Sequence, residues 1–163
     1  MDGIWRDIRL LLLLAVANTA PLLAKRWFGH RFSAPLDGGL IFFDGHPLLG
    51  SSKTIRGLIV AVAATSLGAV VLSLPATVGA LVGAGAMLGD AIASFIKRRL
   101  GAEPSSRATG LDQIPEALLP LLVVKGLLGL TLAQIAALTV FFFMLEMPLA
   151  WLFHRFGLRD RPY

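Results

Sequence analysis

The sequence predicts an all-α integral membrane protein, a single polytopic domain over residues 1–163 built as a bundle of about five transmembrane helices. The chain is 56% hydrophobic and only 15% charged, whereas soluble domains contain about 25% charged residues. Its mean hydropathy is +0.75. The apolar residues also fall into five long segments, which are separated by tight turns or by basic loops. Composition and segmentation together predict a multi-pass membrane protein.

Each apolar segment is a candidate membrane span. A span needs about 20 apolar residues, with a range of about 17–25, so the first, second and fourth segments are short. Pro115 near the start of the fourth segment fits a first helical turn, where proline is tolerated. The predicted spans are residues 8–23, 58–74, 76–96, 114–130 and 132–153.

The first span has some marks of a signal peptide, because Arg6 and Arg9 precede a run of leucines. Asp2 and Asp7 offset both arginines, however, and cations also follow the segment. A signal peptide needs a net positive start. We therefore expect an uncleaved first span.

The cations are unevenly distributed. Loops 25–56 and 97–113 and the C-terminal tail hold most of the 15 lysines and arginines. With five spans these three regions lie on the same side of the membrane. The positive-inside rule then predicts a cell-membrane protein with two cytoplasmic loops and its N-terminus outside.

The third span carries four glycines in two G-x-x-x-G steps, namely Gly79, Gly83, Gly85 and Gly89. Small residues at this spacing let helix backbones approach closely. We expect them to pack within the bundle, since the pattern does not require a dimer and specifies no oligomeric state.

Composition narrows the chemistry. The chain has no cysteine, which excludes disulfides and thiolate metal sites. Its three histidines are scattered, so a zinc site is not expected. A net charge of +5 is compatible with nucleic acid, anionic lipid or a nucleotide. In so apolar a chain we expect lipid and nucleotide, and no nucleic acid.

A polar stripe ends the third span. On a helix, Asp90, Ser94, Lys97 and Arg98 fall on one face, from membrane depth to the cytoplasmic surface. An ionisable residue within a membrane span is costly and indicates a functional site. The stripe predicts a site for a phosphorylated lipid. The simpler alternative makes the cations topology anchors and Asp90 an ion-pair partner.

Asp112 begins the fourth span, and the short connection can bring it back towards Asp90. Two carboxylates across such a corner can bind Mg²⁺, which prefers oxygen ligands and retains substrate phosphates. We therefore predict a magnesium site formed by Asp90 and Asp112. Lys125 and Glu146 lie within spans at depths that do not match well, and no role is predicted for them.

The first cytoplasmic loop contains the run GSSKT over residues 50–54. It does not fit a Walker A loop, because Ser51 and Ser52 separate Gly50 from Lys53 and no βαβ unit surrounds it. Backbone amides, hydroxyls and a cation before a helix N-terminus nevertheless suit phosphate. The alternative is a solvated loop that binds no phosphate, in which Lys53 and Arg56 serve only as membrane-topology anchors.

Two motifs resemble those of a known family. The run DGxxLLGxxKTxRG over residues 44–57 resembles a loop of the CDP-archaeol synthases. The run GDAIASFIKRRLG over residues 89–101, followed by LDQ at 111–113, is similar to the second signature of that family. It is also a shortened form of the pattern in bacterial CDP-diacylglycerol synthases. Gln113 replaces the arginine of the latter enzymes, and their downstream second aspartate is absent. These departures favour the archaeol-type branch.

The resemblance implies a membrane CTP-dependent cytidylyltransferase of phospholipid biosynthesis, with catalytic loops in the cytoplasm. CTP and a lipid phosphate would give CDP-lipid and pyrophosphate, and the lipid could be an isoprenoid ether lipid or a diacyl lipid. Asp90 and Asp112 would hold Mg²⁺, while Lys97, Arg98 and Lys53 would act on phosphates. The expected substrate-binding residues are Gly50, Ser51, Lys53, Thr54, Arg56, Ser94 and, more weakly, Asp44 and Asp37.

Two other classes remain open at this point. A small transporter could place Asp90 in a permeation path, but the cations gather on one face and no pair of broken half-helices is apparent. A non-catalytic membrane assembly subunit would use the glycines for packing, and its charges would be dispensable.

Overall fold

The structure is a computed structural model that describes residues 2–102 and 110–155. The described residues form a five-helix bundle without a β-strand, as the sequence predicts. Residues 103–109 of the second predicted loop and the tail from residue 156 lie outside the described part. The helices are α1 (Asp2–Phe28), α2 (Ile55–Val71), α3 (Ala76–Arg99), α4 (Gln113–Leu128) and α5 (Leu132–Arg155).

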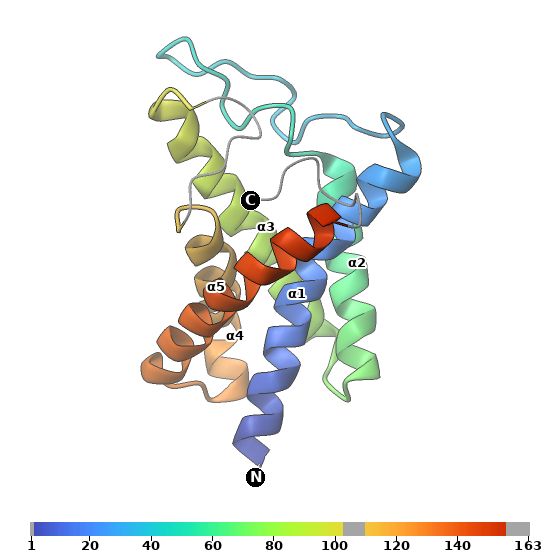
Figure 1. The fold of residues 1–163 in the computed structure, drawn as a ribbon, viewed down its shortest axis with the longest axis vertical. Helices are drawn as coiled ribbons and strands as arrows, with labels where there is room; N and C mark the ends of the chain where they lie inside the picture. The colour runs from blue at the N-terminus through green and yellow to red at the C-terminus, as the bar shows by residue number, and fades with distance from the viewer. Residues whose placement is uncertain (1, 103–109, 156–163) are drawn as a thin grey trace.

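The helices run up and down between two ends of the bundle (Figure 1). The N-terminus lies at the lower end in that view, together with the tight turns between α2 and α3 and between α4 and α5. The long α1–α2 loop, the end of α3 and the start of α4 lie at the opposite end. The two loops that carry the predicted site residues are therefore on the same side.

The helices differ in how far they could cross a membrane. Among the described residues, α1 and α3 are long and apolar enough to span a bilayer, and α2 and the apolar part of α5 are shorter. α1 runs beyond the predicted residue 23 to Phe28, and α3 runs beyond 96 to Arg99. In both helices the added turn is basic, and cations stabilise the C-terminal end of a helix dipole.

α3 is the central helix, and its glycines face two neighbours. A Cβ at Gly79 would come within 2.2 Å of the Thr65 carbonyl oxygen of α2. A Cβ at Gly85 would lie 2.7 Å from Cα of Pro120 in α4. The same holds for Gly83 against α2 and Gly89 against α4. The four glycines thus pack α3 directly onto two helix backbones inside the bundle.

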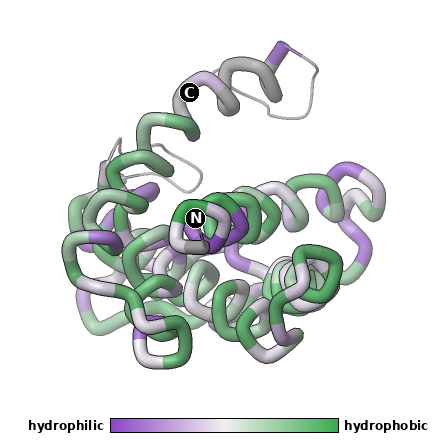
Figure 2. The backbone as a smooth tube through the Cα atoms, turned by 90° about the horizontal axis from the view of Figure 1, so that it is seen from below, coloured by the Kyte–Doolittle hydropathy of each residue, from purple (hydrophilic) through white to green (hydrophobic). Residues whose placement is uncertain are grey.

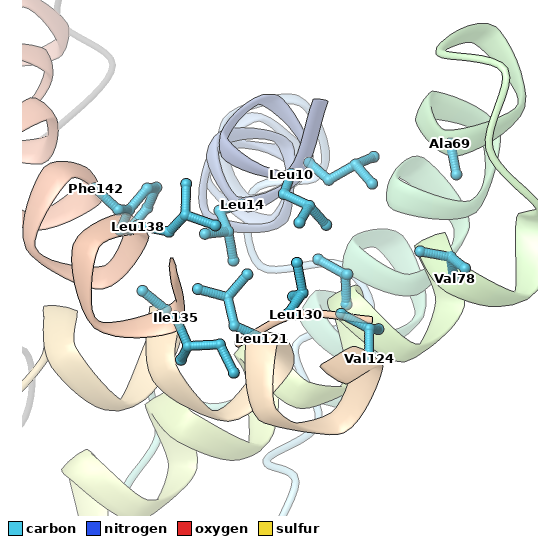
Figure 3. Close-up of a cluster of buried hydrophobic side chains, with 13 residues drawn as sticks. Leu10, Leu14, Ala69, Val78, Leu121, Val124, Leu130, Ile135, Leu138 and Phe142 are labelled. Atoms are coloured by element: carbon cyan, nitrogen blue, oxygen red, sulfur yellow. The ribbon is translucent and has the colours of Figure 1, made fainter. Parts of the chain in front are cut away.

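The apolar core lies where α1, α4 and α5 meet (Figure 3). Leu10 and Leu14 of α1 point towards Leu121 of α4, and Ile135 and Leu138 of α5 close the same cluster. All five side chains are buried. This core fixes the two outer helices against the α3–α4 pair that carries the site.

The outer surface of the bundle is also apolar. Hydrophobic residues lie on outward as well as inward arcs of the helices when the bundle is viewed from below (Figure 2). Exposed large side chains include Leu67 and Val71 of α2, Leu127 of α4 and Phe141 of α5. A helix that is hydrophobic all round is typical of a membrane span.

The α1–α2 loop is folded on itself. Isolated antiparallel bridges join Pro35 to Thr54 at its base and Ile41 to Pro47 near its tip. The tip reverses at Gly45, whose φ of +79° is easily adopted only by glycine. We call residues 35–54 the hairpin loop. It lies across the upper end of the bundle and reaches the end of α3 (Figure 1).

Candidate active site

The hairpin loop is tied to the middle of α3 by an ion pair. Lys53 donates a hydrogen bond from Nζ to Oδ2 of Asp90. The two side chains are only 18% and 17% exposed. Attraction between charges is stronger in such a partly buried site than in water. Two residues that the sequence places 37 positions apart, and that were both predicted site residues, therefore form a direct contact.

A second lysine–carboxylate pair lies closer to the end of the bundle. Nζ of Lys97 is 2.6 Å from Oδ1 of Asp112. Asp112 occupies the N-cap position of α4, but its side chain caps no backbone N–H of that helix. Its carboxylate faces Lys97 on α3 instead, and it also interacts electrostatically with Arg98. The α3–α4 corner thus brings together three of the predicted phosphate- or metal-binding residues.

The antiparallel packing of α3 and α4 sets the depth of each pair. Asp90 precedes Lys97 by seven residues, which is about 10 Å along a helix. Asp112 lies beside Lys97, and one turn further along α4 the side chain of Glu116 hydrogen-bonds Asp90. The carboxylate that directly contacts Asp90 is therefore Glu116, and Asp112 lies nearer the surface.

The close contact at this depth depends on Gly89. A Cβ at Gly89 would lie 2.2 Å from the Pro115 carbonyl oxygen and 2.8 Å from the Glu116 backbone nitrogen. Only glycine allows the two backbones to approach so closely. The residue before Asp90 therefore determines which residue of α4 lies beside it.

Two site residues were missed by the sequence reasoning. Glu116 follows Asp112 by four positions, which places both on one helix face; that spacing could have identified it. Glu146 of α5 was noticed without a role, and it lies close enough to Glu116 to interact electrostatically with it. Glu146 as a whole residue is only 8% exposed. Three helices thus contribute carboxylates to one buried polar centre.

Asp37 organises the hairpin loop from within. Its Oδ2 accepts hydrogen bonds from the backbone N–H groups of Leu49 and Gly50, at 2.8 and 3.2 Å. Its Oδ1 accepts one from Gly39 N–H. Partial burial alone would raise the pKa of Asp37, but these three backbone donors together lower it below its usual value. The Asp37 carboxylate therefore already accepts from the backbone amides of Leu49 and Gly50, which could otherwise bind a phosphate.

Three other predicted binding residues contact the protein's own chain. Thr54 caps α2 by accepting a hydrogen bond from Gly57 N–H through Oγ1. Arg56 donates to the carbonyl oxygens of Gly29 and Arg31, which fastens the base of the loop to the end of α1. Asp44 pairs with Arg99 at 2.9 Å. None of these three contacts involves the Lys53–Asp90 pair, and the substrate roles of Thr54, Arg56 and Asp44 stay predictions.

The remaining predicted residues lie around the two pairs. Ser94 is buried on α3 between the depths of Asp90 and Lys97. Arg98 is also buried, and a Cβ on Gly50 would lie 4.0 Å from its Cδ. An open pocket of about 290 Å³ in the hairpin loop is lined by Pro35, Asp37, Gly39, Ile41, Pro47, Gly50 and Ser51.

The donor set fits a hard cation bound together with substrate. Asp90 and Asp112 offer carboxylate oxygens on side chains that are 17% and 16% exposed. Within the described ranges, no three metal-ligating side chains cluster closely enough to form an all-protein site. Mg²⁺ needs only one or two carboxylates when water and phosphate complete its shell. The site is thus suited to a metal that arrives with a phosphorylated ligand.

Comparisons with known proteins agree with this reading. A family model described as "CarS-like: CDP-archaeol synthase" matches residues 2–163. The chain is 38% identical to a CDP-archaeol synthase of Aeropyrum pernix over 137 residues, which cover 80% of this chain and 75% of that protein. It is 42% identical to one of Methanopyrus kandleri over 120 residues, with 69% and 68% covered.

A solved structure has the same fold. It is described as an intramembrane enzyme for archaeal membrane lipids biosynthesis, and it matches with a TM-score of 0.73 and 32% identity. The match covers 86% of this chain and 90% of that chain. The enzyme prediction is therefore confirmed over the transporter and the assembly subunit. By sequence and by fold, this chain belongs to the CDP-archaeol synthase family of membrane cytidylyltransferases in lipid biosynthesis.

Proposed function

We propose that the chain transfers the cytidylyl group of CTP to an isoprenoid ether-lipid phosphate, giving a CDP-lipid and pyrophosphate. The observation that carries this proposal is the pair of lysine–carboxylate contacts, Lys53 with Asp90 and Lys97 with Asp112, beneath the hairpin loop. The ether lipid is preferred because the curated relatives described above are CDP-archaeol synthases.

The reaction joins two polyanions, so charge compensation is the main task of the protein. An oxygen of the lipid phosphate attacks the α-phosphorus of CTP, and a new P–O bond forms. The bond from the α-phosphorus to the oxygen that bridges to the β-phosphorus breaks, and pyrophosphate leaves with that electron pair. Lys53 and Lys97 lie on two sides of the corner where these charges would gather.

Asp90 and Asp112 are the proposed ligands of Mg²⁺. Because they lie at different depths, each would hold an ion together with substrate phosphate rather than share one. When bound, the ion would supply charge stabilisation at the phosphates. The lysines now paired with these carboxylates would then be available to the phosphate oxygens. Arg98 and Ser94, both buried beside the pairs, would complete the phosphate contacts, and Gly50 and Ser51 would contact the nucleotide from the pocket side.

The site is proposed to face the cytoplasm, where CTP is made. The supporting observation is that the α1–α2 loop, the end of α3 and the start of α4 lie at one end of the bundle. Residues 25–56 and 97–113, which include the helix ends beside the connections, hold nine of the 15 lysines and arginines. The apolar outer surface would let both lipid chains stay in the bilayer throughout the reaction.

The direct test uses purified protein in detergent with labelled CTP and Mg²⁺. One arm contains a geranylgeranyl ether-lipid phosphate and the other contains phosphatidic acid. We expect labelled CDP-lipid in the first arm at a rate at least about tenfold higher than in the second. Equal rates would overturn the lipid assignment, and no product in either arm would overturn the reaction.

Variants test the site itself. Asp90→Asn and Asp112→Asn should each lower turnover by about 100-fold or more, because each removes a carboxylate charge that is assigned to the metal. Asp7→Asn is the matched control, since Asp7 pairs with Arg6 at the far end of α1. The unfolding temperatures of all three variants should be similar. Retention of most activity by either Asp90→Asn or Asp112→Asn would refute the metal assignment.

A further inference from the structure

The guanidinium of Arg99 joins the tip of the hairpin loop to the end of α3. Nε lies 2.9 Å from Oδ2 of Asp44. Nη2 donates hydrogen bonds to the backbone carbonyl oxygens of Pro47, at 2.7 Å, and His46, at 3.3 Å. All three acceptors belong to the turn of the loop, whereas Arg99 belongs to the helix. One helical side chain therefore holds the turn through three polar contacts.

Two aromatic rings enclose the same group. The Arg99 Cζ lies 4.6 Å from the centre of the Phe42 ring and 4.8 Å from that of Phe95. The rings themselves meet edge to face, with centroids 5.5 Å apart. Phe42 comes from the loop and Phe95 from α3, so the aromatic contact crosses the same junction. A cation over an aromatic face is attracted to it, most strongly where water is excluded.

This arrangement suits arginine better than lysine. A guanidinium is flat, stacks on rings and donates in several fixed directions, whereas an ammonium is a compact point charge. Here the stacking partners and the three oxygen acceptors require both properties. The Arg99 side chain is only 19% exposed, so its partners are the loop and α3.

The docked tip leads directly into the site. Oδ2 of Asp37 holds the amides of Leu49 and Gly50 just after the turn. Gly50 lies next to Arg98, and Lys53 reaches Asp90 three residues later. The position of the tip on α3 therefore sets where the second half of the loop meets the buried charges.

We propose that Arg99 is a positioning residue, which docks the hairpin loop on α3 and thereby sets the affinity for the nucleotide without touching the reacting phosphates. This role rests on the proposed function, because the loop is assigned there to CTP. On this proposal Asp44 belongs to the docking contact, as the carboxylate partner of Arg99.

Loop docking can be measured without any catalysis. Because the chain has no cysteine, a single Leu40→Cys substitution, at a side chain 62% exposed on the loop, gives one site for a nitroxide label. We expect an immobilised spectrum in the otherwise unchanged protein and a markedly more mobile one with Arg99→Gln. Arg31→Gln, at an exposed arginine before the loop, is the charge-matched control and should leave the spectrum unchanged.

Kinetics provides the second readout. Arg99→Gln should raise the KM for CTP about tenfold, while kcat at saturating CTP and the KM for the lipid phosphate stay within about twofold. The KM for CTP of Arg99→Lys should lie between those of the unchanged protein and Arg99→Gln, because lysine keeps the charge but not the flat guanidinium. Asp44→Asn should also raise the mobility of the label and the KM for CTP, but by less than Arg99→Gln. It replaces Arg99→Gln in both experiments if that variant does not fold.

The outcomes are distinct. An unchanged label spectrum in Arg99→Gln would overturn the docking role. A collapse of kcat with an unchanged KM for CTP would place Arg99 in the chemistry and overturn the positioning role. If the unchanged enzyme forms no CDP-lipid, the proposed function fails, and the label experiment still decides whether Arg99 docks the loop.

Discussion

Asp90 is contacted from two directions by side chains of different charge. Lys53 approaches it from the hairpin loop, and Glu116 hydrogen-bonds it from α4. On the proposed function, a phosphate that approaches Lys53 would compete with Asp90 for the ammonium group, and Glu116 would then hold Asp90 in place.

Substitution of Glu116 tests this arrangement. Glu116→Gln keeps a hydrogen-bond donor beside Asp90 and should retain activity within a few-fold. Glu116→Ala removes the partner and should lower turnover by about 10–100-fold, as is typical of residues that orient a ligating group. Steady-state rates of both variants with CTP and lipid phosphate provide the measurement. Equal rates for the two would show that the hydrogen bond is not used.

Among the helices, α3 determines the geometry of the site. Its glycines let α2 and α4 touch its backbone on two sides, and its last three turns present Asp90, Lys97 and Arg99 to three different partners. A side chain between α3 and α4 would separate the carboxylates that now lie together. The helix interface and the polar centre are thus parts of one feature.

Gly89→Ala should therefore impair both stability and activity. The new methyl group would clash with the backbone of Pro115 and Glu116, which are not flexible side-chain ends. Overpacking of this kind costs about 1–3 kcal/mol. Gly126→Ala in α4 is the matched control, because a Cβ there meets nothing within 4 Å. The unfolding temperature of the protein in detergent and the rate of CDP-lipid formation should both be lower in Gly89→Ala, and both should be unchanged in Gly126→Ala. Equal behaviour of the two variants would contradict the close-packing argument.

For the whole molecule, the sequence predicts the helices well and the contacts between them poorly. Each helix follows from a local run of apolar residues ended by prolines, glycines or cations, so all five could be located. The contact between Glu116 and Asp90 depends on how α3 and α4 are aligned along their lengths, which Gly89 sets by direct backbone contact. No local pattern contains that alignment.

The hairpin loop was harder still to predict. Lys53 and Asp90 were both expected at the site, but their pairing joins residues far apart in sequence. The contacts of Asp44 and Arg56 with the protein itself could not be predicted, because a motif shows which residue types are present and not which of them fasten the loop.

The orientation of the whole bundle gives a topology prediction. With single cysteines at Leu40 or Ala76, both exposed and at opposite ends of the bundle, a membrane-impermeant maleimide should distinguish the two. Leu40→Cys should react only when the cytoplasmic face is accessible, and Ala76→Cys only from outside. The reversed pattern would overturn the cytoplasmic assignment, and the cysteine-free parent gives the background.

The length of α4 has a consequence for the surrounding bilayer. Its 16 residues rise about 24 Å, whereas the hydrocarbon core of a bilayer is about 30 Å thick. Lipid beside a short span adjusts by local thinning, at a modest cost per ångström of mismatch. Thinning next to α4 moves the headgroup plane inward, towards the depth of Glu116 and Asp90. A lipid phosphate on that flank therefore has a shorter distance to travel to the buried charges than one at the longer helices.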